Sequence, residues 1–285
     1  MNVNYMLISI VILAVAIAIP FVTFEKKKPK ARQIVMIAVM SALTVAANII
    51  CACTIPLHAG TALVIISGIA FGPESGFLIG VLSRFVCNFF MGQGMWTPWE
   101  MAAWGILGAL AGIAFYKPEI SGHFDDKKEI MKKKTQKGLS YMAVPVVCML
   151  LSELAGYIVY IFTATEGETF FGWRLYAFGL AGIVISVILM HRRIPCNFVT
   201  VTIFTFVSVF VIYGGLMNIA AMMMNSTLSD SGSSQVSWEA LKLLYITGAP
   251  YDAAHALGAS VCAFMFGDGL LDKLTRARIK YGLSL

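Results

Sequence analysis

The sequence predicts an all-α polytopic membrane protein with about nine membrane segments. Three observations predict this class: 59% of the 285 residues are hydrophobic and only 13% are charged, apolar stretches of membrane-spanning length recur, and the basic residues gather in a few connections. A soluble domain has about a quarter charged residues, whereas about 20 apolar residues cross a membrane core. A soluble protein is therefore excluded, and the net charge of +6 reflects membrane topology rather than a nucleic-acid partner.

The predicted membrane segments are the apolar runs between charged connections or breaker residues. In chain order they are residues 3–24, 34–53, 60–71, 76–91, 98–115, 139–163, 172–190, 198–224 and 253–267. We interpret residues 1–25 as an uncleaved anchor, because no basic residue precedes the first apolar run and no A-x-A site follows it. Residues 26–285 then form one transmembrane domain.

The basic residues predict the orientation. Eighteen of the 21 Lys and Arg lie in four connections, at residues 26–32, 117–137, 192–193 and 273–280. An outside N-terminus puts all four on one side of the membrane, which the positive-inside rule assigns to the cytoplasm. The chain is therefore predicted to be N-out and C-in, with a basic cytoplasmic loop at 117–138 and a long outer loop at 225–251.

The two short segments, 60–71 and 76–91, form either two thin helices or one re-entrant excursion, and we favour two helices. A helix of residues 60–71 is only about 18 Å long and cannot cross about 30 Å of hydrocarbon alone. Irregular backbone must flank it, which is tolerated only where protein or a water-filled cavity covers it. This predicts a cavity near the outer ends of the second to fifth segments.

The sequence carries no sign of an active site, so we predict neither an enzyme nor a bound metal or cofactor. It lacks the phosphate loop, the H-E-x-x-H and G-x-S-x-G motifs, and a pair of Asp-rich motifs. Its six cysteines are scattered through apolar segments, and Cys51-x-Cys53 has no second ligand pair. We therefore expect that the chain does not itself hydrolyse ATP.

A charged side chain inside a membrane segment costs several kcal/mol unless it is paired or hydrated, so each ionisable residue there is a candidate for a structural or functional role. Arg84 lies midway along the fourth segment, Glu100 begins the fifth and Glu153 lies midway along the sixth. Arg84 could pair with Glu100 or Glu153, and an anionic substrate group could replace one partner. A purely structural ion pair remains the alternative.

Polar and aromatic residues gather at the predicted outer ends. The connection between the fourth and fifth segments reads Gly92-Gln93-Gly94-Met95-Trp96-Thr97-Pro98-Trp99-Glu100. This composition suits a pocket for a planar or bulky ligand, although an interfacial aromatic belt and interhelical hydrogen bonds are simpler explanations. The candidate substrate-binding residues are Asn48, His58, Arg84, Asn88, Gln93, Trp96, Trp99, Glu100, Glu153 and Asn218.

Small residues recur every fourth position in the second segment, at Ala38, Ala42 and Ala46. Such a face lets another helix approach closely. The neighbour is either a helix of the same chain or a helix of a partner subunit.

Three stretches together resemble the substrate-specific S component of energy-coupling factor (ECF) vitamin transporters. They are residues 32–50 with the alanine stripe, the run LVIISGIAFGPESGFLIGVLS at 63–83, and residues 99–116. The resemblance covers about residues 32–116. In the rest of the chain only the hydropathy pattern is similar. It implies a six-helix core, here with an extra N-terminal span and additional C-terminal spans.

The resemblance also implies the function, partners and location. The chain would be the substrate-binding subunit of an ECF-type ABC importer in the bacterial plasma membrane, capturing a vitamin at its outer face. Ala38, Ala42 and Ala46 would dock on a transmembrane coupling subunit that carries two cytoplasmic ATPases. The Gln93–Glu100 connection is similar to that of S components predicted to carry cobalamin, so a corrinoid is the first substrate expectation.

The chain is larger than the family's core, which favours a larger ligand or a lid over the site. Within the predicted outer loop, Ser237 is a candidate N-cap for a short amphipathic helix that begins at Trp238. Two other functions stay open. One is an integral-membrane enzyme acting on lipids, for which Glu100, Asp252 and His255 are the residues that could serve. The other is a stand-alone secondary transporter, which would normally show an internal repeat between its two halves.

Overall fold

The computed structural model describes residues 5–54, 57–116, 145–165, 168–190, 196, 198–228 and 237–283, and all regular secondary structure in these ranges is helical. The elements are α1 (Tyr5–Lys26), α2 (Ala31–Thr54), α3 (Ala59–Phe71), α4 (Pro73–Met91), α5 (Thr97–Phe115), the helix Pro145–Thr163, α7 (Trp173–Met190), α8 (Phe198–Ser208), the π-helix η1 (Val209–Gly214), α9 (Gly215–Leu228) and α10 (Trp238–Tyr281).

The all-α membrane fold is confirmed. In the described ranges seven helices are long and apolar enough to cross a membrane, with α8, η1 and α9 taken as one continuous helix, and α3 and α7 are shorter apolar helices. Every predicted segment therefore overlaps a helix. How many of these helices cross, and the N-out, C-in orientation, stay predictions.

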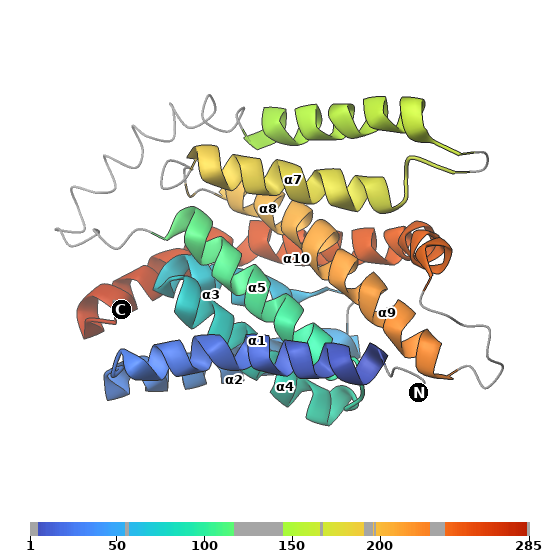
Figure 1. Cartoon of the computed structure of the whole chain (residues 1–285). Coiled ribbons are helices and arrows are strands. Elements are labelled where there is room, and N and C mark those ends of the chain that lie inside the picture. Colours follow the sequence, from blue (N-terminus) through green and yellow to red (C-terminus); the bar gives the residue numbers. More distant parts are fainter. Residues whose placement is uncertain are drawn as a thin grey trace.

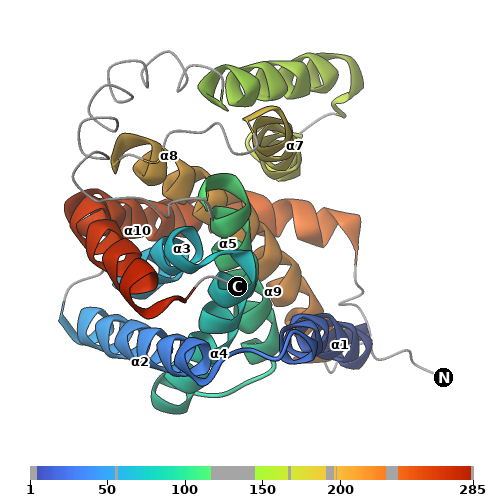
Figure 2. The same cartoon turned by 90° about the vertical axis from the view of Figure 1, so that its left-hand side faces the viewer.

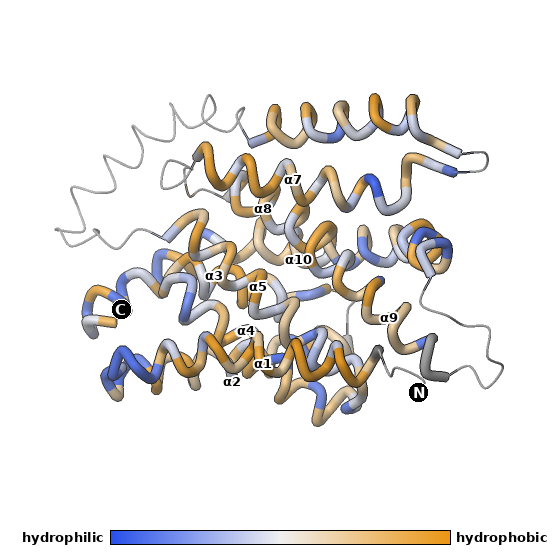
Figure 3. Tube along the Cα trace, in the orientation of Figure 1, coloured by the Kyte–Doolittle hydropathy of each residue, from blue (hydrophilic) through white to orange (hydrophobic). Residues whose placement is uncertain are grey.

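The helices lie roughly side by side, so the bundle has two ends (Figure 1). Arg32 at the start of α2 donates from Nη1 to the carbonyl oxygen of Tyr281 at the end of α10 at 2.9 Å, and Lys27 pairs with Glu74 at the start of α4. Hydrophilic residues gather at this end, which we call the basic end (Figure 3). We call the opposite end the outer end, following the predicted orientation.

Close packing of α3, α4 and α5 forms the centre of the molecule. Gly68 of α3, Gly76 of α4 and Gly108 of α5 meet there, and a Cβ on any of them would lie far inside van der Waals contact with the backbone of another. The breaker Gly72 between α3 and α4 has φ +97°, a conformation that favours glycine. The two short segments thus form two separate helices, and the choice between two spans and one re-entrant excursion stays a prediction.

The prediction for the last segment was wrong in extent. Ser237 does cap a helix, because its Oγ accepts a hydrogen bond from the Ala240 N–H at 3.1 Å, but that helix continues to Tyr281 instead of remaining short. Residues 238–251, predicted to be part of the outer loop, are therefore helical. Pro250 lies inside α10, and the first turns run in a different direction from the rest (Figures 1 and 2), as expected for a proline kink.

Several sequence predictions fall on positions outside the described residues. These are the basic loop 117–138, the start of the sixth segment before residue 145, the basic pair 192–193 and the part of the outer loop at 229–236.

Candidate functional site

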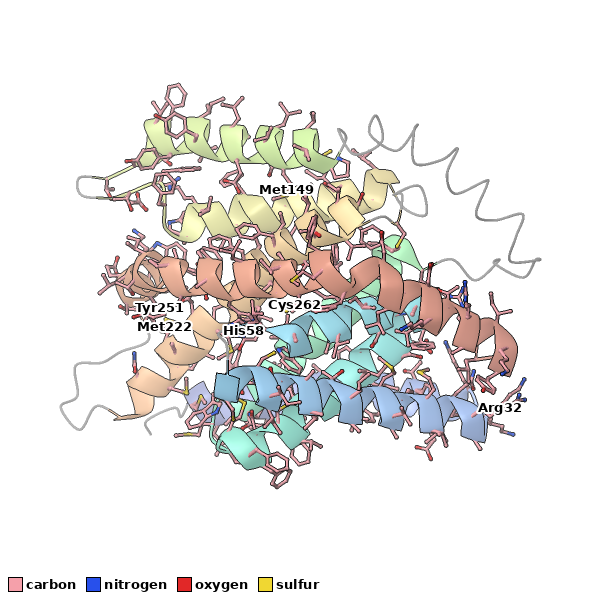
Figure 4. All side chains as sticks on the ribbon, turned by 180° about the vertical axis from the view of Figure 1, so that it is seen from behind. Arg32, His58, Met149, Met222, Tyr251 and Cys262 are labelled. Carbon is pink, nitrogen blue, oxygen red and sulfur yellow. The ribbon has the colours of Figure 1, made fainter. Side chains whose placement is uncertain are left out.

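A cavity of about 150 Å³ lies where α2 ends and α3 begins, at the outer end of the bundle. Its lining comes from α2, α4, α5, η1, α10 and the approach to α3, namely Asn48, Cys51, Ala52, Leu57, His58, Arg84, Met91, Trp104, Tyr213 and His255. Figure 4 shows His58 between α2 and α10. The cavity therefore lies near the outer ends of the second to fifth segments. A cavity was predicted there because the segment 60–71 is too short to cross the membrane alone.

The glycine at the start of α3 shapes one wall of this cavity. A Cβ on Gly60 would lie 2.8 Å from both the Asn48 side chain and the Trp104 ring. Because only glycine leaves that space, α3 can begin directly against α2 and α5. Asn48 donates there to two sulfur atoms, Cys87 Sγ at 3.6 Å and Met91 Sδ at 3.4 Å.

Arg84 pairs with Glu100, which resolves the choice left open by the sequence. The Arg84 guanidinium donates from Nη2 to Glu100 Oε1, and both side chains are nearly buried, at 12% and 8% exposed. Glu100 Oε2 also accepts from Asn88 Nδ2 at 2.7 Å. The pair and the Asn88 amide join α4 to α5 and hold Arg84 at the cavity wall.

Two residues that line the cavity each carry a fully buried hydrogen-bond donor that has no acceptor among the described residues. The two donors are the Arg84 Nε and Trp104 Nε1 atoms. The Arg84 Cζ atom lies 5.2 Å from the centre of the Trp104 ring, within cation–π range. A buried donor without a partner costs about 1–3 kcal/mol. A ligand that accepts from these groups would recover that free energy, provided that the two side chains turn toward the cavity.

Aromatic and imidazole rings form another part of the wall. The His58 and His255 ring centres are 4.0 Å apart, and Tyr213 meets His255 edge to face at 4.3 Å. Thr61 Oγ1 lies 3.0 Å from His255 Nε2. Flat ring faces combined with a few polar groups are typical of a site for a planar ligand.

Sequence reasoning missed Tyr213 and Thr61, did not include Trp104 among the candidate substrate-binding residues, and named His255 for the enzyme alternative. Tyr213 is presented by the π-helix η1, a local widening that is frequent at functional sites. The only signal in the sequence is the Gly214-Gly215 pair that follows it, which is too common to identify such a turn.

Seven of the ten predicted site residues do not line the cavity. Two of them, Asn88 and Glu100, hold Arg84 at its wall, and the other five lie farther away. Gln93 is exposed and accepts from Thr97 Oγ1 at 3.0 Å, and Trp96 is 39% exposed beside Gly94. Trp99 packs in a cluster with Met6 of α1. The remaining two, Glu153 and Asn218, are described next.

Glu153 and Asn218 belong to the other half of the bundle. Glu153 faces Gly179 of α7 and does not pair with Arg84. Asn218 donates from Nδ2 to Asp252 Oδ2 at 2.9 Å, and the Tyr176 hydroxyl donates to the same oxygen at 2.6 Å. This cluster joins α7, α9 and α10 beside the cavity, since Asp252 is one turn from His255.

A charged cluster joins the other outer connections. Glu168 accepts from Arg174 Nη2 at 3.1 Å and from Trp173 Nε1 at 3.2 Å, and pairs with Lys242 at 3.4 Å. Burial alone would raise the pKa of the Glu168 carboxyl, but the hydrogen bonds from Trp173 and Arg174 outweigh it and lower the pKa to about 2. The cluster ties the start of α10 to the connection before α7.

The alanine stripe of α2 faces away from the bundle. Ala38, Ala42 and Ala46 are all exposed, whereas Met40 and Thr44 on the other face of α2 are buried. Within the described part of the chain the stripe is thus an open face, available to a helix of another subunit.

The fold and the outer cavity define a class: a multi-pass helical membrane protein with a cavity at one end of the bundle. Residues 28–192 match the family model of the ECF-type riboflavin transporter, S component. Because this match covers more than half of the chain, the chain belongs to the family of ECF transporter S components, which are transporter subunits and not enzymes. It is a multi-pass protein of the bacterial cell membrane.

Curated relatives match over a shorter stretch. Two UPF0397 proteins of Aliivibrio fischeri, from strains MJ11 and ATCC 700601 / ES114, are each 31% identical over 85 residues. The aligned region is 27% of this chain and 46% of each relative, so the chain spans less than half the length of these relatives. No solved structure matches the chain.

Proposed function

We propose that this chain is the substrate-binding subunit of an ECF transporter and that it captures a vitamin in the outer cavity. A coupling membrane subunit and two separate ATPases would then complete uptake. The observation that carries the proposal is a cavity lined by rings, two of whose lining residues, Arg84 and Trp104, have a buried donor without an acceptor among the described residues.

The substrate that suits this wall best is a flavin, the vitamin in the name of the matching family model. A planar heteroaromatic ring can stack on Tyr213, and its ring carbonyl oxygens can accept from Arg84 and Trp104. The cavity of about 150 Å³ is smaller than the roughly 300–1,000 Å³ of typical ligand pockets. Binding must therefore widen it.

Cobalamin is the second candidate. The similarity of the Gln93–Glu100 connection to S components predicted to carry cobalamin favours it, as does the length of the chain beyond a six-helix core. A corrinoid would require a much larger opening of the same cavity.

The test is to titrate the purified chain with riboflavin and, separately, with cobalamin, using Trp104→Phe and Trp99→Phe as a matched pair. Both tryptophans are buried and neither Nε1 has a partner among the described residues, but only Trp104 lines the cavity. We expect Trp104→Phe to weaken riboflavin binding up to about tenfold, the value of one hydrogen bond, and Trp99→Phe to leave it unchanged.

The outcomes separate the site from its substrate. Cobalamin binding with the same dependence on Trp104 would keep the cavity and change the vitamin. Binding that ignores both substitutions would move the site elsewhere, and failure of both vitamins to bind would overturn the flavin and corrinoid proposals.

We further propose that Ala38, Ala42 and Ala46 form the docking face for the coupling subunit, since the stripe is open. Ala42→Leu should reduce co-purification of the coupling subunit while vitamin binding is retained, because added bulk blocks close helix approach. Ala181→Leu is the matched control, since Ala181 is exposed on α7. Equal recovery with both variants would remove the docking assignment.

A further inference from the structure

An apolar groove of about 500 Å³ runs between α2, α3 and α10, distinct from the outer cavity. Leu43 and Ala47 of α2 form one wall, and α10 forms the other from Cys262 to Lys273. Figure 4 shows Cys262 on α10, above α3. The only charged residue in its lining is Lys273.

The groove opens toward the surface that faces lipid. Leu43 is 48% exposed on one lip, and Met265 and Phe266 are 62% and 59% exposed on the other. An empty apolar groove loses dispersion contacts along its walls, and in a bilayer the molecules at hand to fill it are lipid chains. Its shape and its surroundings therefore favour a long, flexible apolar occupant.

The length and polarity of the groove fit one leaflet. From Cys262 to Lys273 the helix advances about 16 Å at 1.5 Å per residue, close to half of the roughly 30 Å hydrocarbon thickness. Lys273 lies toward the basic end, where Tyr281 meets Arg32. A lysine at the membrane boundary can extend its ammonium group to the headgroup level.

We propose that the groove binds a glycerophospholipid from the leaflet at the basic end, with one acyl chain between α2 and α10 and its phosphate against Lys273. The inference concerns a different surface from the vitamin cavity and does not depend on which vitamin is carried. Gly269 lines the groove and a Cβ there would meet nothing within 4 Å, so this position accepts a larger side chain without a clash at Cβ.

The test is photo-cross-linking of the full chain in vesicles of phosphatidylcholine and phosphatidylglycerol that contain phosphatidylglycerol with a diazirine on one acyl chain. Peptide mapping then locates the adducts. We expect them to concentrate on Leu43, Ala47 and the 262–270 stretch of α10. The exposed residues Leu150 and Leu154, on the helix Pro145–Thr163, report the background from bulk lipid.

Two substitutions probe the two ends of the site. Gly269→Leu should fill the groove and remove its adducts while leaving those on Leu150 and Leu154, with Gly269→Ala as a milder version. Lys273→Gln should lower the groove adducts about fivefold, the effect of one basic residue near a lipid surface. Lys280→Gln is the matched control, because Lys280 is exposed on the same helix but does not line the groove.

The unfolding midpoint and the monodispersity of each variant show that it is folded. Adducts spread evenly over the lipid-facing helices, or groove adducts unchanged by Gly269→Leu, would overturn the proposal. So would cross-links between two copies of the chain across Leu43 and Met265, since a second copy would then occupy the groove.

Discussion

Buried charge at Arg84 and Glu100 is the main residue-scale feature of the membrane region. Both side chains are nearly buried, and Asn88 supplies a further hydrogen bond to Glu100. A charge at this depth is tolerated because it is paired, and the pair holds Arg84 beside the cavity.

Glu100→Gln should destabilise the protein by about 3–5 kcal/mol, because it leaves the Arg84 guanidinium buried without a counter-charge. Lys27→Gln is the control. It breaks a pair whose side chains are 51% and 29% exposed, so its cost should stay below about 1 kcal/mol. Unfolding in detergent measures both effects, and equal small effects would mean that water reaches Arg84.

The outer cluster around Glu168 predicts a pH dependence. The pKa of Glu168 is about 2 in the folded protein, below its ordinary value of 4.5, so folding favours the carboxylate. The stability that this carboxylate contributes is fully present above about pH 4.5 and is lost as the pH falls through about 2.

Glu168→Gln should therefore lower stability by an amount that is constant above pH 4.5 and shrinks as the pH falls toward 2. Unfolding midpoints of the wild type and the variant across this range measure it. A difference that stays unchanged down to pH 2 would show that Glu168 acts through packing and not through its charge.

Among the elements, the contacts of α3, α4 and α5 depend on glycine at the crossing points. Gly108 faces the Gly76 carbonyl and Gly68 faces the Gly108 carbonyl, so backbone meets backbone without intervening side chains. This close packing allows the short α3 to remain covered by protein.

Gly108→Ala should separate these helices and strongly lower the unfolding midpoint, because the backbone atoms it would meet belong to a helix and cannot shift cheaply. Gly269→Ala is the matched control, since its Cβ enters open space. It should be neutral or stabilise α10 by up to about 1 kcal/mol. A Gly108→Ala protein as stable as the control would show that the helices can move apart freely.

At the scale of the whole molecule, the start of α2 and the end of α10 meet at the basic end of the bundle, as the hydrogen bond from Arg32 to Tyr281 shows. Basic residues from distant parts of the chain thus lie at the same end of the bundle, as expected if that end faces the cytoplasm. The positive-inside rule is the reason for this expectation.

In a background without native cysteines, a membrane-impermeant maleimide should label Met95→Cys on intact cells and Lys280→Cys only after permeabilisation. Both positions are exposed, at opposite ends of the bundle. The reverse pattern would invert the orientation and would place the candidate cavity on the cytoplasmic side.

Local sequence signals were enough for the class of fold and for most helix boundaries. The predicted segment 60–71 became α3 at Ala59–Phe71, and 98–115 became α5 at Thr97–Phe115, because apolar runs between Gly, Pro and charged residues determine where a membrane helix can lie. The signal failed for α10, where Pro250 and polar residues interrupt the apolar run although the helix continues through them.

The composition of the cavity was decided by tertiary structure. Asn48, His58 and Arg84 were predicted from polar residues near the outer ends and do line it, and Asn88 and Glu100 hold Arg84 in place. Tyr213 and His255 come from distant helices, and only packing brings them to the same wall. Hydropathy shows which residues enter the membrane, because that depends on each segment's own transfer free energy; which faces meet depends on contacts between segments far apart in the chain.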